Sequence, residues 1–269
     1  MSAKQSIDFD GLGEKHKALE RISAGQKLIP EVPTIARLDG RAFHTFLRDA
    51  DKPFDSRVVR AMQETAKELL DKFNAEVAYV QSDEITLVWK SCPIFDGKVQ
   101  KVLSTTAALA SVVFDREIYE ETGMRKGPIP TFDCRVWQVP DLETAAENIL
   151  WREMDATKNS ISMMASAHFS EKQLDGISTK KRLIMLEGID VHWENLPHYL
   201  KRGTYYQKVE RWKVITDEEM VEIPEKHRPI APVLRNVIEM QPYPPATTIS
   251  NFAGVLFNNE TVEFHKEEP

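Results

Sequence analysis

Two acidic residues, Asp39 and Asp83, stand beside short β-rich runs and could do chemistry together. Asp39 follows the alternating run 33–38, which is typical of a strand that ends in a turn. Asp83 lies between the runs 77–81 and 85–89, a spacing that leaves room only for a tight hairpin. Carboxylates at adjoining strand ends could hold two Mg²⁺ ions, because Mg²⁺ prefers oxygen ligands and leaves positions open for phosphate oxygens.

The elements that must position these residues follow one another in the order β-α-β-β-α-β. A helix is predicted from Asp55 to Phe73, a second over 98–122, and a further strand over 132–139. This order predicts an α+β fold of the ferredoxin-like, split βαβ type, with an antiparallel sheet. The first strand then lies beside the central hairpin, so Asp39 and Asp83 should face each other.

The rest of the chain divides into two parts. A helical segment over 141–169 can cover the open face of the sheet. Seven of the 15 prolines fall in residues 214–269, which indicates an extended or docking tail. We therefore expect a palm-type domain with covering helices over 1–212 and a proline-rich C-terminal extension over 213–269.

The composition limits the class of protein. With 269 residues and 42% hydrophobic content, the chain can bury a core. The net charge of −7 argues against a protein that coats nucleic acid by bulk electrostatics, although it permits a local basic face. No run approaches the roughly 18 apolar residues of a membrane span, so we expect a cytoplasmic protein without a membrane partner. The two cysteines, Cys92 and Cys134, form no metal-binding pair.

The string Arg37–Phe46, RLDGRAFHTF, resembles the signature of the tRNA-His guanylyltransferases and their like-proteins. Further segments resemble the family in the same order, and together they cover about residues 8 to 212. They are Asp10–Lys15, Lys52–Pro53, Gln81–Glu84, Phe132–Arg135, Trp151–Ile161 and Lys201–Thr204. The resemblance implies a palm like that of polymerases, working in the 3′-to-5′ direction.

The resemblance also implies a set of site residues. Asp39, the Gly40 backbone and Asp83 would hold two Mg²⁺ ions, and both aspartates would be catalytic. The nucleotide-binding residues implied are Asp39, Gly40, Arg41, Ala42, Phe43, His44, Lys52, Ser82, Asp83, Lys101, Arg135 and Asn159. Three of them, Lys52, Lys101 and Arg135, are cations that could pair with triphosphate oxygens. For Lys101 a solvated surface charge is an equal alternative.

The implied reaction uses ATP and GTP as substrates and the 5′ end of a tRNA as acceptor. The 5′ phosphate is first adenylylated with ATP, and the 3′-hydroxyl of GTP then attacks it while AMP leaves. Basic clusters with interleaved aromatic residues could hold the acceptor stem if they converge. They comprise Arg125, Lys126, Lys180, Lys181, Arg182, Lys201, Arg202, Lys208 and Arg211, with Tyr205, Tyr206 and Trp212. The family resemblance further suggests a homotetramer.

Residues 157–163 differ from the His-Ile-Asn-Asn-Leu-Tyr-Asn run of eukaryotic members. This region looks like the like-protein branch, whose members tend to add templated nucleotides and repair truncated tRNA 5′ ends. Both outcomes stay open. Two other functions are considered: a nucleotidyl cyclase, whose Gly-Gly-Asp-Glu-Phe turn is replaced here by Gln81–Glu84, and a catalytically silent tRNA-binding module, against which the intact Asp39 and Asp83 speak.

Overall fold

The structure is a computed structural model that describes residues 9–91, 94–122, 128–228 and 232–266. The expected β-α-β-β-α-β order is confirmed. Its elements are β1 (Thr34–Gly40), α3 (Ser56–Phe73), β2 (Val77–Gln81), β3 (Glu84–Trp89), α4 (Val99–Thr122) and β4 (Phe132–Gln138). Helix α3 begins where predicted, because the Asp55 side chain caps it by accepting a hydrogen bond from the Arg57 amide.

The strands form one six-stranded antiparallel sheet in the order β4-β1-β3-β2-β5-β6. Its first four strands have the ferredoxin-like arrangement that the sequence predicts. Strands β5 (Thr204–Lys213) and β6 (Val233–Gln241) extend the sheet beyond β2. The sequence patterns predicted neither β5 nor β6, and β6 lies in the proline-rich extension.

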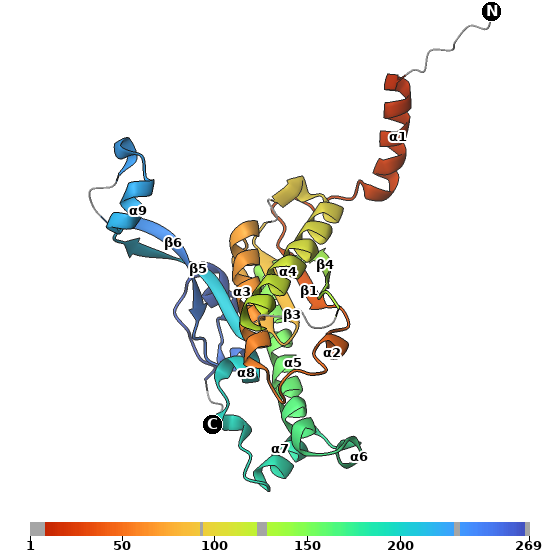
Figure 1. The fold of residues 1–269 in the computed structure, drawn as a ribbon, viewed down its shortest axis with the longest axis vertical. Helices are drawn as coiled ribbons and strands as arrows, with labels where there is room; N and C mark the ends of the chain where they lie inside the picture. The colour runs from red at the N-terminus through yellow and green to blue at the C-terminus, as the bar shows by residue number, and fades with distance from the viewer. Residues whose placement is uncertain (1–8, 92–93, 123–127, 229–231, 267–269) are drawn as a thin grey trace, which may run out of the picture.

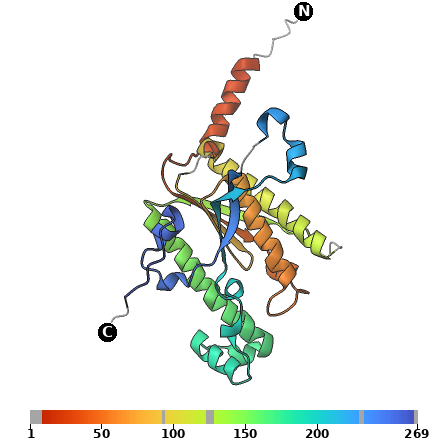
Figure 2. The same cartoon turned by 90° about the vertical axis from the view of Figure 1, so that its left-hand side faces the viewer.

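The two faces of the sheet are covered by different helices, as Figure 2 shows. Helices α3 and α4 pack on one face, hereafter the α3/α4 face, against an apolar cluster that includes Leu38 and Ile85. Helix α5 (Leu142–His168) covers part of the other face, hereafter the α5 face. Because successive side chains of a strand point to opposite faces, Asp39 and Leu38 belong to different faces.

Helix α5 confirms the covering helix expected over 141–169. Asp141 caps its first turn by accepting a hydrogen bond from the Thr144 amide at 2.8 Å. The helix runs past the edge of the sheet into a small helical region (Figure 1). That region contains α6 (Glu171–Leu174), α7 (Thr179–Glu187) and α8 (His198–Arg202), packed around a cluster that includes Leu186 and Trp193.

The remaining elements lie at the periphery or on the α5 face. Helix α1 (Phe9–Ala24) projects from the body of the molecule in both views, and α2 (Phe43–Phe46) is a short turn after β1. Helix α9 (Asp217–Glu222) lies beyond the β5–β6 pair, while α10 (Phe252–Asn258) packs beside α5. None of the helices in the described ranges is long and apolar enough to cross a bilayer.

Candidate nucleotide and metal site

Asp39 and Asp83 lie at adjoining ends of the central strands. The Gly40 amide donates to the Asp83 carbonyl oxygen at 3.0 Å, which joins the end of β1 to the β2–β3 turn. Burial raises the pKa of the Asp83 carboxyl group, and the negative charge of Asp39 raises it further. Among the described residues, neither carboxylate has a cationic side chain as an ion-pair partner. The two aspartates therefore form a neighbouring, uncompensated pair.

This pair has the chemistry of a divalent-cation site. Two carboxylates of like charge repel each other, and a hard cation with oxygen ligands would relieve that repulsion. The described part of the chain holds no cluster of three or more His, Cys, Asp and Glu side chains suited to a metal. A cation here would therefore depend on Asp39, Asp83 and backbone oxygen atoms, and its remaining positions would stay open for phosphate or water.

The loop after Asp39 is shaped by close packing. A Cβ atom on Gly40 would lie 2.4 Å from the Phe43 ring, so only glycine fits without displacement. Phe43 is 2% exposed, and the centroid of its ring lies 5.1 Å from the ring centroids of Phe114 and Phe132. Ala42 adopts the left-handed conformation, with φ of 54°, to start α2. The ring of Phe43 thus belongs to the core, and only its backbone could contact a nucleotide.

Arg41 and His44 present exposed side chains from the same loop. The Arg41 amide donates to the Thr131 carbonyl at 2.8 Å, which fixes the loop against the segment before β4. The His44 Nε2 atom lies 3.0 Å from the Thr45 hydroxyl. These two side chains are therefore available to a ligand that approaches the Asp39 end of the strand.

A pocket opens between the segment after α2, the β2–β3 turn and α5. Its volume is about 810 Å³ including its open mouth, and Lys52, Ser82 and Asn159 all line it. Its apolar wall includes Val58 and Met62. A hollow along α5 shares Lys52, Ser82 and Asn159 with this pocket. The fold thus brings three of the predicted nucleotide-binding residues to one cavity beside the Asp83 turn.

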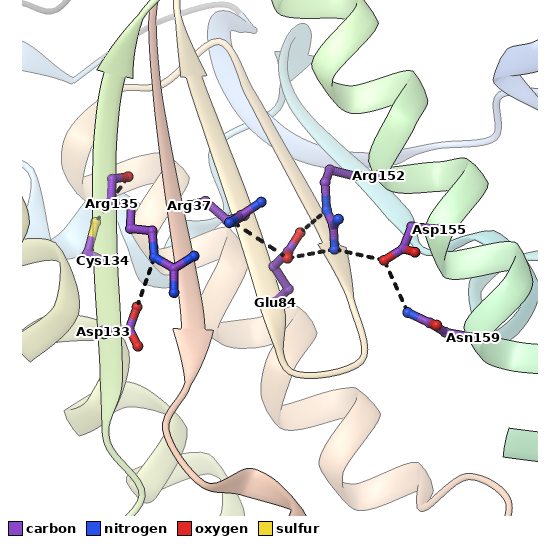
Figure 3. Close-up of polar contacts among 8 residues, drawn as sticks. All are labelled: Arg37, Glu84, Asp133, Cys134, Arg135, Arg152, Asp155 and Asn159. Atoms are coloured by element: carbon purple, nitrogen blue, oxygen red, sulfur yellow. Dashed lines mark hydrogen bonds and ion pairs between the residues drawn. The ribbon is translucent and has the colours of Figure 1, made fainter. Parts of the chain in front are cut away.

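Lys101 and Arg135 have different positions. Lys101 is exposed near the start of α4, which covers the α3/α4 face. Phe114 of the same helix, whose ring packs against Phe43, lies about 20 Å further along at 1.5 Å per residue. Arg135 lies on the α5 face of the edge strand β4, with its side chain 61% exposed and 3.9 Å from Asp133 (Figure 3). The structure brings Arg135, but not Lys101, to the face that carries Asp39.

The described basic residues of these clusters lie on three elements, α7, α8 and β5. Lys208 pairs with Asp71 at 3.2 Å, and Arg211 pairs with Glu239 at 2.6 Å. Lys180, Lys181 and Arg182 lie on α7, and Lys201 and Arg202 lie on α8. Tyr205 and Tyr206 are buried and cannot stack on RNA, whereas Trp212 is 73% exposed. Arg125, Lys126 and Cys92 lie outside the described residues.

Three residues that meet next to the β2–β3 turn were not among the predicted site residues: Arg37, Glu84 and Arg152. Arg152 donates from Nε to Glu84 Oε1 at 2.6 Å and from Nη2 to Glu84 Oε2 at 2.7 Å (Figure 3). Arg37 lies 3.8 Å from the same carboxylate. Burial raises the pKa of Glu84, while the Arg152 hydrogen bonds lower it. The segment Trp151–Ile161 carried the signal, but only the fold shows that its arginine reaches the turn.

Comparison with known proteins finds solved structures with a similar fold. A bacterial tRNA(His) guanylyltransferase-like protein solved in complex with ATP has a TM-score of 0.69 and 33% identity, over 74% of this chain and 87% of that one. The family model described as tRNAHis guanylyltransferase matches residues 13–140. The chain belongs to the tRNA(His) guanylyltransferase family. Members of this family are nucleotidyltransferases, and the palm-type fold expected from the sequence is confirmed.

Two further relatives show the extent of the similarity. A bacterial tRNA(His) guanylyltransferase-like protein in complex with GTP has a TM-score of 0.69 and 29% identity, over 88% of this chain and 94% of that one. The tRNA(His) guanylyltransferase of Debaryomyces hansenii is 28% identical over 195 residues, which cover 66% of this chain and 74% of that protein. The similarity to family members therefore extends beyond the strands and helices that position Asp39 and Asp83.

Proposed function

We propose that this nucleotidyltransferase adds GTP or templated nucleotides to the 5′ end of tRNA in the 3′-to-5′ direction. The observation that carries the proposal is the uncompensated pair of Asp39 and Asp83 beside a pocket lined by Lys52, Ser82 and Asn159. A carboxylate pair next to a cavity with a cation suits a nucleoside triphosphate and its divalent ions. The solved relatives with ATP and GTP support nucleotides as substrates.

Each group has a role in this proposal. Asp39, Asp83 and the Gly40 backbone hold two Mg²⁺ ions, which when bound lower the pKa of an attacking hydroxyl and stabilise a leaving phosphate. Lys52, which lines the pocket, neutralises triphosphate oxygens. The apolar wall of the pocket accommodates the base, and Asn159 offers its amide to the ligand.

The chemistry proceeds in two transfers. The RNA 5′ phosphate attacks the α-phosphorus of ATP, so that pyrophosphate leaves and AMP is joined to the RNA end. The 3′-hydroxyl of the incoming GTP then attacks the activated 5′ phosphorus, loses its proton and displaces AMP. In this proposal, Arg41 and His44, which follow Asp39 and have exposed side chains, contact the phosphates of either reactant.

The RNA substrate proposed is that of the like-protein branch. Residues 157–163 lie on α5 beside the pocket and lack the histidine of the eukaryotic run. We therefore propose that the enzyme repairs 5′-truncated tRNAs by templated addition and does not require tRNA-His. We further propose that it acts in the cytoplasm as a homotetramer.

The experiment supplies labelled GTP, ATP and Mg²⁺ with full-length and 5′-truncated tRNAs, and compares the wild-type chain with the Asp39→Ala and Asp83→Ala variants. We expect label at the 5′ end of truncated tRNA with the wild-type chain and essentially none with either variant. Unextended RNA with the wild-type chain would refute the proposal. In that case, cyclic products from GTP alone would indicate a cyclase, and Mg²⁺-independent tRNA binding a silent binding module.

A further inference from the structure

A third carboxylate, that of Glu84, lies close to the proposed cation site, which uses only Asp39 and Asp83. Glu84 follows Asp83 directly and lies opposite Asp39 in the register of β1 and β3. Glu84 and Asp39 therefore point to the same face of the sheet, and the charge of Asp39 raises the pKa of Glu84. A third free carboxylate here would occupy a cation position that phosphate oxygens need.

Arg152 donates hydrogen bonds to both oxygens of the Glu84 carboxylate, at 2.6 Å and 2.7 Å. Glu84 is 5% exposed and Arg152 is 8% exposed, so water does little to weaken this bidentate pair. Arg37 adds a second guanidinium group 3.8 Å from the carboxylate.

Arg152 is itself held in place by its neighbours on α5. Its Nη2 atom lies 3.2 Å from Asp155 Oδ2, and its guanidinium carbon lies 4.6 Å from the centre of the Trp151 ring. Asp155 in turn accepts a hydrogen bond from Asn159, which lines the nucleotide pocket (Figure 3). A continuous polar chain therefore runs from the pocket wall to the turn that carries the proposed cation ligand.

We infer that Arg152 is a positioning residue, which holds Glu84 out of the cation site so that Asp39 and Asp83 alone present their carboxylates to it. The inference rests on the proposed function, because it takes that pair as the cation site. Without Arg152, the buried Glu84 carboxylate would keep Arg37 as its one cationic neighbour among the described residues, 3.8 Å away, and burying so weakly paired a charge is costly. Rotation toward the cation would relieve that cost and block an open position.

The test measures Mn²⁺ binding to the full chain by electron paramagnetic resonance, together with nucleotide addition. We expect Asp83→Asn to weaken Mn²⁺ binding at least about tenfold, whereas Glu84→Gln stays within about threefold of the wild-type chain. Arg152→Gln should bind Mn²⁺ about tenfold more tightly and add nucleotides about tenfold more slowly. The double variant Arg152→Gln/Glu84→Gln should return Mn²⁺ affinity to the wild-type range, which a merely structural role would not do.

Arg116→Gln is the matched control, because it removes the same charge from a guanidinium–carboxylate contact with Glu68 that joins α4 to α3. An equal rise in Mn²⁺ affinity there would assign the effect to net charge and overturn the inference. Unchanged Mn²⁺ affinity in Arg152→Gln, or a loss in Glu84→Gln as large as in Asp83→Asn, would also overturn it. If Arg152→Gln does not fold, the comparison of Glu84→Gln with Asp83→Asn still tests whether Glu84 stays out of the cation site. An equal loss of Mn²⁺ affinity in the two variants would overturn the inference.

The two proposals fail in different ways. A wild-type chain that binds no Mn²⁺, or that binds it equally well after Asp39→Asn and Asp83→Asn, refutes the proposed cation site and with it the role of Arg152. Weakened binding in both aspartate variants, together with no response to Arg152→Gln, leaves the proposed site in place and refutes the positioning role alone.

Discussion

The two faces of the central sheet differ in what their side chains do, although the same strands supply both. On the α3/α4 face, Leu38 and Ile85 are fully buried in an apolar cluster with the helices. On the α5 face, their chain neighbours Asp39 and Glu84 lie opposite each other and bear charge. Because successive side chains of a strand point to opposite faces, alternate residues of one strand pack in the core or carry the charged groups of the proposed site.

The faces also differ in how burial is tolerated. Apolar side chains on the α3/α4 face gain free energy when they leave water. Charged side chains on the α5 face lose hydration, and Glu84 recovers that loss through Arg152. Asp39 and Asp83 have no such partner among the described residues. The α3/α4 face therefore stabilises the fold, whereas the α5 face carries two carboxylates whose mutual repulsion is unfavourable.

The sharpest test of this comparison uses neighbours on β1. We expect Asp39→Asn to slow nucleotide addition about a thousandfold, because it removes a proposed cation ligand worth several kcal/mol in the transition state. Its free energy of unfolding should stay within about 0.5 kcal/mol of the wild-type value. Leu38→Ala should instead cost about 3 kcal/mol of stability through a core cavity. Urea unfolding and single-turnover addition measure the two effects.

The comparison would break if the two substitutions behaved alike. A large loss of stability in Asp39→Asn would make the aspartate part of the core. A thousandfold loss of addition rate by folded Leu38→Ala chains would show that the α3/α4 face takes part in the chemistry.

Gly40→Ala changes the end of β1, where Asp39 on the α5 face is followed by a glycine that packs against Phe43 in the cluster of the α3/α4 face. The new Cβ would lie 2.4 Å from the Phe43 ring, which is held between Phe114 and Phe132 and cannot move freely. We expect a loss of about 1–3 kcal/mol in the free energy of unfolding. Addition should slow as well, because the displaced loop adjoins Asp39.

Gly13→Ala is the control for this substitution, since its Cβ would meet no atom within 4 Å. Gly13 lies within helix α1, so alanine there should leave stability unchanged or raise it by up to about 1 kcal/mol. Equal effects at the two glycines would contradict the packing argument for Gly40.

The smallest effect concerns the pH dependence of stability, measured by urea unfolding with EDTA present. The pKa of Asp83 is raised in the folded chain, so folding favours its protonated form. The wild-type chain should therefore lose stability as pH rises through that raised pKa, while Asp83→Asn loses none from this group. The free energy of unfolding of Asp83→Asn should therefore rise relative to that of the wild-type chain between pH 4 and pH 7. A constant difference across this range would show that the folded chain does not perturb Asp83.

Sequence patterns predicted that the strand end at Asp39 and the turn at Asp83 adjoin, as the structure shows. Asp39 and Asp83 were found because a strand end and a tight hairpin have short-range signals, and the order of elements placed them side by side. Strand β6 was missed because its exposed, proline-flanked run has little hydrophobic periodicity, and its partner β5 supplies the hydrogen bonds that make it a strand. The position of Lys101 depends on how α4 docks, which no local pattern encodes.

The sequence by itself determined the β-α-β-β-α-β order of the central elements, the family and the placement of Asp39 and Asp83 at adjoining strand ends, because these follow from residue types at fixed short spacing. The tertiary structure decided that the Phe43 side chain is buried in the core and that Lys52, Ser82 and Asn159 line one pocket. It also decided that Arg152 donates hydrogen bonds to Glu84. Those outcomes depend on the packing of segments far apart in the chain. A charged residue on a helix looks solvated in sequence, and only a partner brought to it by folding makes its burial favourable.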